Sequence, residues 1–243
     1  MESDSGQSVF MLHGTARPMT INCLDNPVWH ALAGPHRAHA IVRGAARHYP
    51  RNMAPFSAIA EASEQAYADL AVDLPPGTEA RLFRPHEEEL PRGWEQMDCF
   101  PMLQMVANAP VGDRSDRVSI LSAEDIPAMM ELVAAAKPGP FGPRTPVLGR
   151  YVGVRDGDRL VAMAGERMKL PGHVELSAIC VHPQARARGH GVALTLHLMH
   201  LAFARGEVPF LHVRPDNTGA VALYRRLGFE TRRELVVVWR KPL

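Results

Sequence analysis

The sequence has 243 residues, of which 46% are hydrophobic and 22% are charged, so it suits one large globular domain or two small ones. A formal net charge of +1, without a long run of Lys or Arg, gives no support to a nucleic-acid-binding surface. No apolar stretch approaches about 20 residues, and the polar, acidic N-terminus does not resemble a signal peptide, which predicts a cytoplasmic protein without membrane contact.

Residues 1–110 are predicted to form an α/β domain that begins with a loosely packed lead at 1–18. A cap-and-proline sequence at 25–27 predicts a short helix, and a second helix at 63–74 ends at a Pro-Pro-Gly sequence. Strands are predicted at 38–49, 55–59, 80–84 and 93–106. This order loosely resembles that of the second half. We therefore keep two hypotheses for the first half, a degenerate copy of the second half's fold or an unrelated small α/β cap.

Turn-forming and charged residues at 109–113 predict a boundary before a second domain at 111–243. A strand at 117–121 is followed by a helix to about residue 136, which Ser122 caps. The loop at 137–146 contains four prolines and two glycines, so it cannot be a regular helix. A strand hairpin follows, with one strand at 150–155 and one at 160–168.

The stretch at 174–181 is apolar and partly β-branched, which predicts a strand. If its side chains alternate, Glu175 and Ser177 share one face with Ile179 and Val181. This would direct the carboxylate of Glu175 toward whatever ligand the strand binds.

The chain then forms a turn at 186–192 that contains two glycines separated by one residue. Backbone N–H groups can point at a ligand there, because no Cβ obstructs a close approach. The helix that begins near Gly191 adds unpaired N–H groups and the positive end of its dipole. The turn is therefore predicted to bind an anion such as a diphosphate.

The predicted helix at 190–205 has two apolar stripes, so we expect the sheet and the first half of the chain to cover it on two sides. A short strand at 208–213 precedes a helix that Asn217 opens and Gly228 ends. Asn217 and Tyr224 lie two turns apart on one face of this helix.

Two parts of the sequence resemble hallmarks of the GNAT superfamily of N-acyltransferases, including its FR47-like domains. The run from Val181 to Gly191, V-x-P-x-x-R-x-R-G-x-G, resembles the acyl-CoA-binding signature, although Ala187 stands where many members carry glycine. The run from Asn217 to Phe229, N-x-x-A-x-x-L-Y-x-x-x-G-F, resembles the second hallmark. The resemblance covers about residues 116–243 and implies an α/β (α+β) GNAT fold, a mixed central sheet flanked by helices.

The resemblance implies transfer of an acyl group, most simply acetyl from acetyl-CoA, to a primary amine of a small molecule or amino acid by direct attack in a ternary complex. The alternative is a non-catalytic acyl-CoA-binding sensor or scaffold, and both a monomer and a homodimer are open. In the family the loop at 137–146 lies over the acceptor site, with a simple connector as the alternative. We also expect the first half of the chain to help shape the acceptor pocket. Residues implied to contact acyl-CoA are Ile179, Cys180, Val181, Arg186, Ala187, Arg188, Gly189, His190, Gly191, Val192, Asn217, Ala220 and Tyr224.

Three residues carry the predicted chemistry. An amine with a pKa of ~10.4 is protonated at pH 7, so its attack needs a base or a water relay. Glu175 is the candidate base, with a pKa that apolar neighbours would raise; the alternative is a solvated carboxylate at the start of the strand. The resemblance assigns the Ile179 N–H to stabilisation of the oxyanion and Tyr224 to protonation of the CoA thiolate. For Tyr224 the alternative is a packed aromatic side chain.

The cysteines and the turn also exclude other chemistry. Cys23, Cys99 and Cys180 are widely spaced and form no C-x-x-C motif, so we expect reduced thiols, no metal site and no covalent intermediate on Cys180. No G-x-x-x-x-G-K-[ST] sequence accompanies the turn, which excludes a nucleotide hydrolase of that type.

Overall fold

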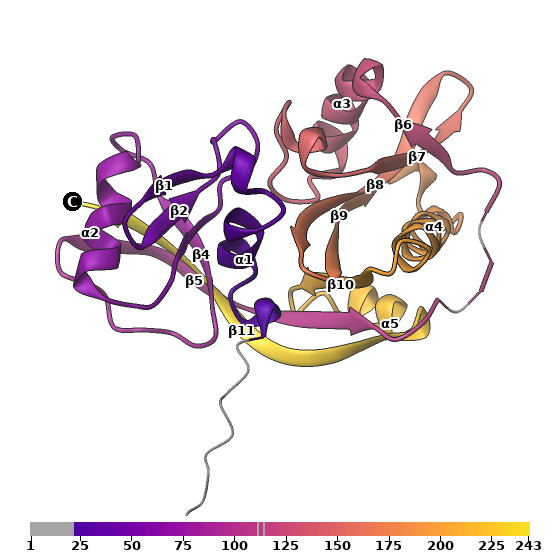
Figure 1. Ribbon diagram of the computed structural model, residues 1–243. Helices are drawn as coiled ribbons and strands as arrows, with labels where there is room; N and C mark the ends of the chain where they lie inside the picture. The colour runs from indigo at the N-terminus through magenta and orange to yellow at the C-terminus, as the bar shows by residue number, and fades with distance from the viewer. Residues whose placement is uncertain (1–21, 111, 114) are drawn as a thin grey trace, which may run out of the picture.

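The computed structural model describes residues 22–110, 112–113 and 115–243 as a mixed α/β fold (Figure 1). Its main element is an eight-stranded sheet in the order β4-β11-β5-β10-β9-β8-β7-β6, and a second, three-stranded sheet has the order β1-β2-β3. The predicted fold class, a mixed sheet flanked by helices, is confirmed. The lead predicted at 1–18 lies outside the described residues.

The strands of the large sheet are β4 (Ala80–Arg84), β5 (Trp94–Ala107), β6 (Ser119–Leu121), β7 (Tyr151–Asp156), β8 (Arg159–Leu170), β9 (His173–Val181), β10 (Val208–Val213) and β11 (Phe229–Pro242). Those of the small sheet are β1 (Ile41–Arg43), β2 (Ala46–His48) and β3 (Ser57–Ile59). The α-helices are α1 (Pro27–Ala33), α2 (Glu64–Asp73), α3 (Ile126–Ala136), α4 (His190–Phe203) and α5 (Thr218–Arg226).

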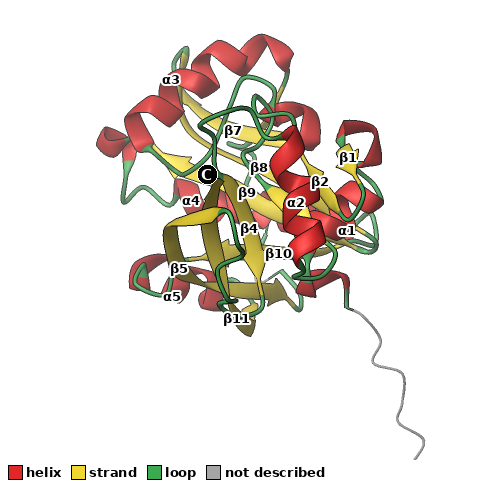
Figure 2. Ribbon diagram, turned by 90° about the vertical axis from the view of Figure 1, so that its left-hand side faces the viewer, coloured by secondary structure: helices red, strands yellow, loops and turns green. Residues whose placement is uncertain are grey.

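The first half forms most of its predicted elements, with one correction. The Ser63 side chain caps α2 by accepting a hydrogen bond from the Ala66 N–H at 3.1 Å. The single strand predicted at 38–49 is wrong, because Gly44 adopts a left-handed conformation (φ +48°) and turns the chain into the hairpin of β1 and β2. Helix α2 packs against this hairpin (Figure 2).

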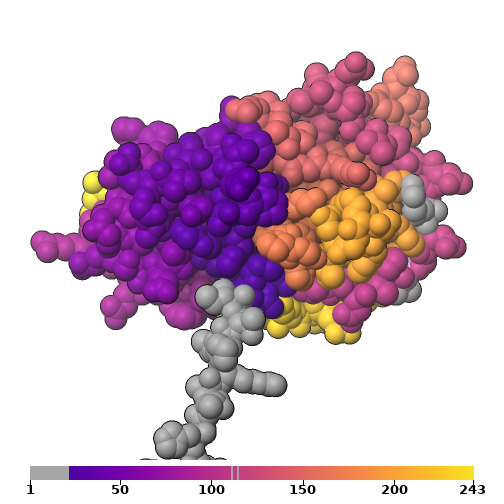
Figure 3. All heavy atoms as spheres, in the orientation of Figure 1, coloured from indigo at the N-terminus to yellow at the C-terminus, as the bar shows by residue number. Residues whose placement is uncertain are grey.

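Strand β5 from the first half lies inside the large sheet. It pairs antiparallel with β10 on one side and with β11 on the other, where the register runs from Phe229–Ala107 to Pro242–Trp94. The predicted division at residue 110 therefore does not separate two sheets. The two halves of the chain meet along a broad boundary on the face shown in Figure 3.

The order strand, helix, strand occurs twice. β9, α4 and β10 form a unit with parallel strands, and β3, α2 and β4 follow the same order, with one isolated parallel bridge between Phe56, just before β3, and Arg81 of β4. β4 then pairs with β11 of the second half, and β10 pairs with β5 of the first half. This exchange of strand partners favours a degenerate second copy over an unrelated cap, and the copy stays a hypothesis.

Helices α4 and α1 lie on opposite sides of the central strands (Figure 1). α4 packs against β7, β8, β9 and β10, and the buried cluster beneath it includes Met105 and Ala107 of β5. The first half thus reaches the α4 side through β5, which is a strand of the sheet itself, whereas α1 packs on β8 in a different cluster. Cover of α4 by the first half on a second side stays a prediction. Within the described ranges, no helix is long and apolar enough to cross a membrane.

Candidate active site

The turn between β9 and α4 has an unusual backbone at the predicted positions. A 3-10 turn at Pro183–Ala185 follows β9, and Ala187 and Gly189 then adopt positive φ values of 62° and 77° before α4 begins at His190. A residue with a Cβ pays about 1 kcal/mol or more for this left-handed conformation. The conformation explains why glycine is common at the position of Ala187 in the signature that this turn resembles.

The N-terminus of α4 can accept an anion. Gly189 is the N-cap and has no side chain to bond the first-turn N–H groups, which also lack partners within the helix. A Cβ on Gly191 would lie 4.0 Å from Leu223 of α5, so α5 borders the same turn. The free N–H groups and the helix dipole together can hold a diphosphate largely by backbone contacts.

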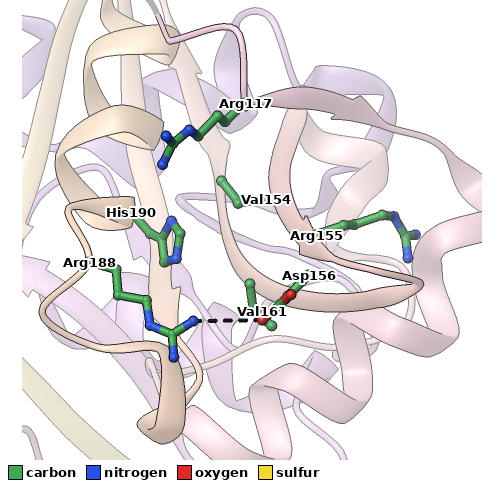
Figure 4. Close-up of a pocket in the computed structure, with 7 residues that line it drawn as sticks. All are labelled: Arg117, Val154, Arg155, Asp156, Val161, Arg188 and His190. Carbon is green, nitrogen blue, oxygen red and sulfur yellow. Dashed lines mark ion pairs between the residues drawn. The ribbon is translucent and has the colours of Figure 1, made fainter.

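A hollow of about 400 Å³ flanks this helix end (Figure 4). Arg117, Arg188 and His190 extend into it, and the Arg188 guanidinium lies 3.6 Å from the Asp156 carboxylate. Arg155 also lines the hollow, but its guanidinium points away and pairs with Asp125. The basic lining favours negatively charged groups beside the turn.

Strands β9 and β10 pair over three residues and then separate. The last pair is Phe210 with Glu175, after which β10 stays paired with β5 alone. We call the unpaired edges, 176–181 of β9 and 211–213 of β10, the seam. Ser177, Ala178 and Ile179 are half-buried there although β9 is a central strand. The seam is therefore an opening in the sheet beside the turn.

A bulge in β9 overturns the expected alternation of its side chains. Ala178 has a φ of +52°, and the register with β8 shifts between the Met163 and Gly165 pairs. Ile179 and Val181 consequently pack with the cluster beneath α4. Glu175 lies on the opposite side with Arg167, so the prediction that Glu175 shares a face with Ile179 is wrong.

Glu175 is fully buried and fully paired. Arg167 donates to both of its carboxylate oxygens, at 2.8 and 2.7 Å, and His212 Nδ1 lies 2.8 Å from Oε1. Burial would raise the pKa of Glu175, but the charge of Arg167 and the hydrogen bonds from His212 and Arg167 outweigh it and lower the pKa to about 2. The predicted rise of this pKa is wrong, and a carboxylate so stabilised is a weak base.

His212 extends this polar cluster into the first half. The Gln104 side-chain amide lies 3.2 Å from His212 Nε2 and donates to the Leu24 carbonyl at 2.8 Å. With Gln104 donating to Nε2, the His212 proton is assigned to Nδ1, which donates to Glu175. Sequence reasoning missed His212, although a histidine in the otherwise apolar strand VPFLHV is a recognisable signal.

Tyr224 and several of the predicted cofactor-binding residues pack on the α4 side of the sheet. Ile179, Val181, Val192 and Ala220 are partly buried against the same cluster as Tyr224, and the Tyr224 ring contacts Phe229 edge-on at 5.9 Å between centroids. Burial raises the pKa of Tyr224 to about 12, so its hydroxyl keeps its proton at neutral pH. The structure thus brings the predicted oxyanion group and the predicted proton donor to one side.

Two predicted residues have other surroundings. The Cys180 side chain is buried with Met163 and Tyr151 in a separate cluster, and burial raises its pKa to about 12. The Asn217 side chain caps α5 by accepting a hydrogen bond from the Ala220 N–H at 3.2 Å. The described residues contain no cluster of three or more His, Cys, Asp or Glu that could bind a metal ion.

Comparisons with known proteins identify the family. Residues 151–238 match the family described as FR47-like protein. The chain is 35% identical over 119 residues to the [Ribosomal protein bS18]-alanine N-acetyltransferase of Salmonella typhimurium, spanning 79% of that protein and 46% of this chain. A crystal structure of a GNAT-family protein from Novosphingobium aromaticivorans superposes with a TM-score of 0.85 and 36% identity, covering 91% of this chain and 99% of that one. The chain belongs to the GNAT family of acetyltransferases.

The family assignment confirms the resemblance read from the two hallmarks, both of which lie within or overlap the matched region. This GNAT protein is also 46% identical over 83 residues to N-alpha-acetyltransferase RimI of Mycobacterium tuberculosis. The alignment covers 33% of this chain, and the chain spans about half (51%) of the length of that relative. The Novosphingobium structure covers most of the first half too, so this GNAT protein shares more than its 116–243 region with a solved relative.

Proposed function

We propose that the protein transfers an acetyl group from acetyl-CoA to a primary amine by direct attack within a ternary complex. The observation that carries this proposal is the position of the glycine turn, the seam and Tyr224 on one side of the sheet, around the N-terminus of α4. Such an arrangement can hold a diphosphate at the turn and a thioester at the seam.

The turn and α4 would bind the CoA portion. Backbone N–H groups from Ala187 to Val192 would contact the diphosphate, and Arg186 and Arg188 would add positive charge, with the His190 side chain lining the same hollow as Arg188. The pantetheine arm would lie along Val181 in the seam, between the turn and α5. The backbone at Cys180 can contribute to this edge, although the Cys180 side chain points away.

The chemistry then needs an oxyanion donor and a proton donor. The amine nitrogen attacks the thioester carbonyl, a C–N bond forms, and the Ile179 N–H stabilises the oxyanion. When the C–S bond breaks, Tyr224 donates its proton to the CoA sulfur and regains one from solvent. Because burial raises the pKa of Tyr224 to about 12, the hydroxyl is protonated and ready to donate at neutral pH.

We propose that the amine proton leaves through solvent and that Glu175 has a positioning role. The buried salt bridge with Arg167 lowers the pKa of Glu175 to about 2, so its carboxylate has little affinity for the proton that a general base would remove. Glu175 instead fixes Arg167 and His212 where β9 and β10 separate.

The test is acceptor-dependent release of free thiol from acetyl-CoA. A panel would include a peptide with a free N-terminal alanine, free amino acids and a polyamine, with a blank that lacks any amine. Release that requires one amine, with the acetylated product found by mass spectrometry, supports the proposal. Tight binding of acetyl-CoA without thiol release for any amine would instead favour the non-catalytic sensor or scaffold.

A further inference from the structure

We propose that the Tyr151 hydroxyl hydrogen-bonds the acceptor and selects an amine that carries a neutral amide carbonyl nearby, as at a peptide N-terminus, over a free amino acid. This inference rests on the proposed acetyl transfer. It concerns the side of the sheet opposite α4, across the seam from the CoA portion.

Tyr151 lies in a row of three paired residues that leads to the seam. Tyr151 of β7 pairs with Gly165 of β8, and Gly165 pairs with Ser177 of β9. A Cβ on Gly165 would come within 2.4 Å of the Tyr151 ring, so the ring lies directly across Gly165. Tyr151 belongs to the same buried cluster as Cys180, and Ala178 packs against that cluster, so β9 borders the Tyr151 side chain.

The hydroxyl is buried and lacks a hydrogen-bond partner among the described residues. Tyr151 is 3% exposed, and no donor or acceptor of the described residues lies within hydrogen-bond reach of its oxygen. Burial raises its pKa above the ordinary value, so the hydroxyl stays protonated and can donate. Buried hydroxyls are almost always paired, because an unpaired one loses its hydrogen bonds to water without replacement. A bound acceptor supplies the missing partner.

The charged groups near Tyr151 already have partners of their own. Arg167 and Glu175 form a two-bond ion pair, and Glu166 binds Arg205 at 2.6 Å. The hydrophobic cluster around Tyr151 includes Met163 and Leu160, and the Phe141 ring lies edge-on to Tyr151 at 5.7 Å between centroids. A carboxylate entering here would lose water and find no unpaired cation among these residues, whereas a neutral carbonyl needs one donor, which Tyr151 provides.

The wall that carries Phe141 is fixed by the first half of the chain. The Arg144 N–H donates to the Asn52 carbonyl at 3.1 Å, and the Thr145 hydroxyl donates to the Met53 carbonyl at 2.6 Å. The proline-rich loop is thus held in place over this side of the sheet. This gives the first half a physical route by which it shapes the acceptor pocket.

The test compares L-alaninamide with L-alanine as acceptors at equal concentrations of free amine, using the full-length protein. These two probes carry the same amine and differ in the neutral amide against the carboxylate. We expect wild type to favour alaninamide, and Tyr151→Phe to lose about 5- to 10-fold in kcat/KM for alaninamide with little change for alanine. Acetyl-CoA affinity should be unchanged, and the Tm should not fall, because the deleted hydroxyl had no partner within the protein.

Tyr67→Phe is the matched control. The Tyr67 hydroxyl bonds Arg240 at 2.5 Å in the cluster around α2, so this variant should lose stability without changing the preference between the two probes. Equal losses for both probes in Tyr151→Phe, or a lower Tm with unchanged kinetics, would overturn the assignment of Tyr151. Thiol release with a polyamine but not with alaninamide overturns the acceptor class and leaves acetyl transfer standing. Absence of thiol release for every amine rejects the proposed function itself.

Discussion

Replacing Glu175 with glutamine removes its charge and nearly preserves its shape. The wild-type carboxylate receives two hydrogen bonds from Arg167 and one from His212, and its pKa is lowered from 4.5 to about 2. A shift of roughly 2.5 units corresponds to about 3 kcal/mol of unfolding free energy at neutral pH. Breaking a buried ion pair from one side typically costs about 3–5 kcal/mol, so we expect Glu175→Gln to lose about 3 kcal/mol.

The pH dependence has a defined sign. Because the folded-state pKa of Glu175 lies below the unfolded value, its contribution is fully present above about pH 4.5 and is lost as the pH falls toward about 2. The difference in unfolding free energy between wild type and Glu175→Gln should therefore be constant from about pH 5 to 8. Below pH 4.5 the difference should shrink, because protonation removes the same charge from wild type.

Urea unfolding measured by the fluorescence of the three tryptophans provides the assay. Asp73→Asn is the control, because Asp73 pairs with Arg43 at the surface and its loss should leave the midpoint nearly unchanged. Equal stability of wild type and Glu175→Gln at pH 7 would refute the buried pair. A normally stable Glu175→Gln whose turnover deficit is confined to neutral pH and disappears by about pH 10 would show that Glu175 is the general base after all.

Three further changes test the turn and the sheet. Gly189→Val should abolish CoA binding in a calorimetric titration, because valine strongly disfavours a φ of +77°. Arg186→Ala should only weaken CoA binding. Unchanged CoA affinity in Gly189→Val would show that the turn is not part of the binding site. Ala187→Gly should raise the unfolding free energy by up to about 1 kcal/mol by relieving a φ of +62°, and a loss of stability in urea unfolding would contradict that strain. The fragment 113–243 lacks β5, the partner of both β10 and β11, so we expect it to be insoluble or unfolded; a soluble, active fragment would show that the second half folds alone.

The turn at 186–192 could be predicted because its requirements are local. Positive φ at Gly189 and Ala187 and free N–H groups at a helix start depend on a few neighbouring residues. The cap at Ser122 is predictable for the same reason, and its side chain accepts a hydrogen bond from the Glu124 N–H at 3.2 Å. Backbone requirements of this local kind can therefore be recognised from the residue types in the sequence.

The position of Glu175 could not be predicted, because it depends on pairing between strands. One residue in the left-handed conformation, Ala178, shifts the register with β8 and reverses which face the later side chains occupy. A count by alternation through 174–181 contains no sign of this bulge. The partners Arg167 and His212 lie on two other strands, so the ion pairs and the pKa of Glu175 depend on how the strands of the sheet are arranged.

The insertion of β5 between β10 and β11 could not be predicted from the sequence, for a related reason. The composition change at 109–113 is real, but it marks a linker between two strands of one sheet. Strand β5 pairs with β11 more than 120 residues later in the chain, as in the pair Phe229–Ala107. Pairing over such a distance depends on the whole fold, and no local pattern encodes it.

The central claim, acetyl transfer with Tyr224 as the proton donor, is tested most directly by comparing wild type with Tyr224→Phe. Thiol release is measured with acetyl-CoA and an identified amine, and CoA affinity is measured by calorimetry. The variant keeps the ring that packs against Phe229 and loses only the hydroxyl. We predict that kcat falls roughly 10²-fold while CoA affinity and Tm are retained. Unchanged turnover in Tyr224→Phe would contradict the mechanism and leave Tyr224 as a packed aromatic side chain.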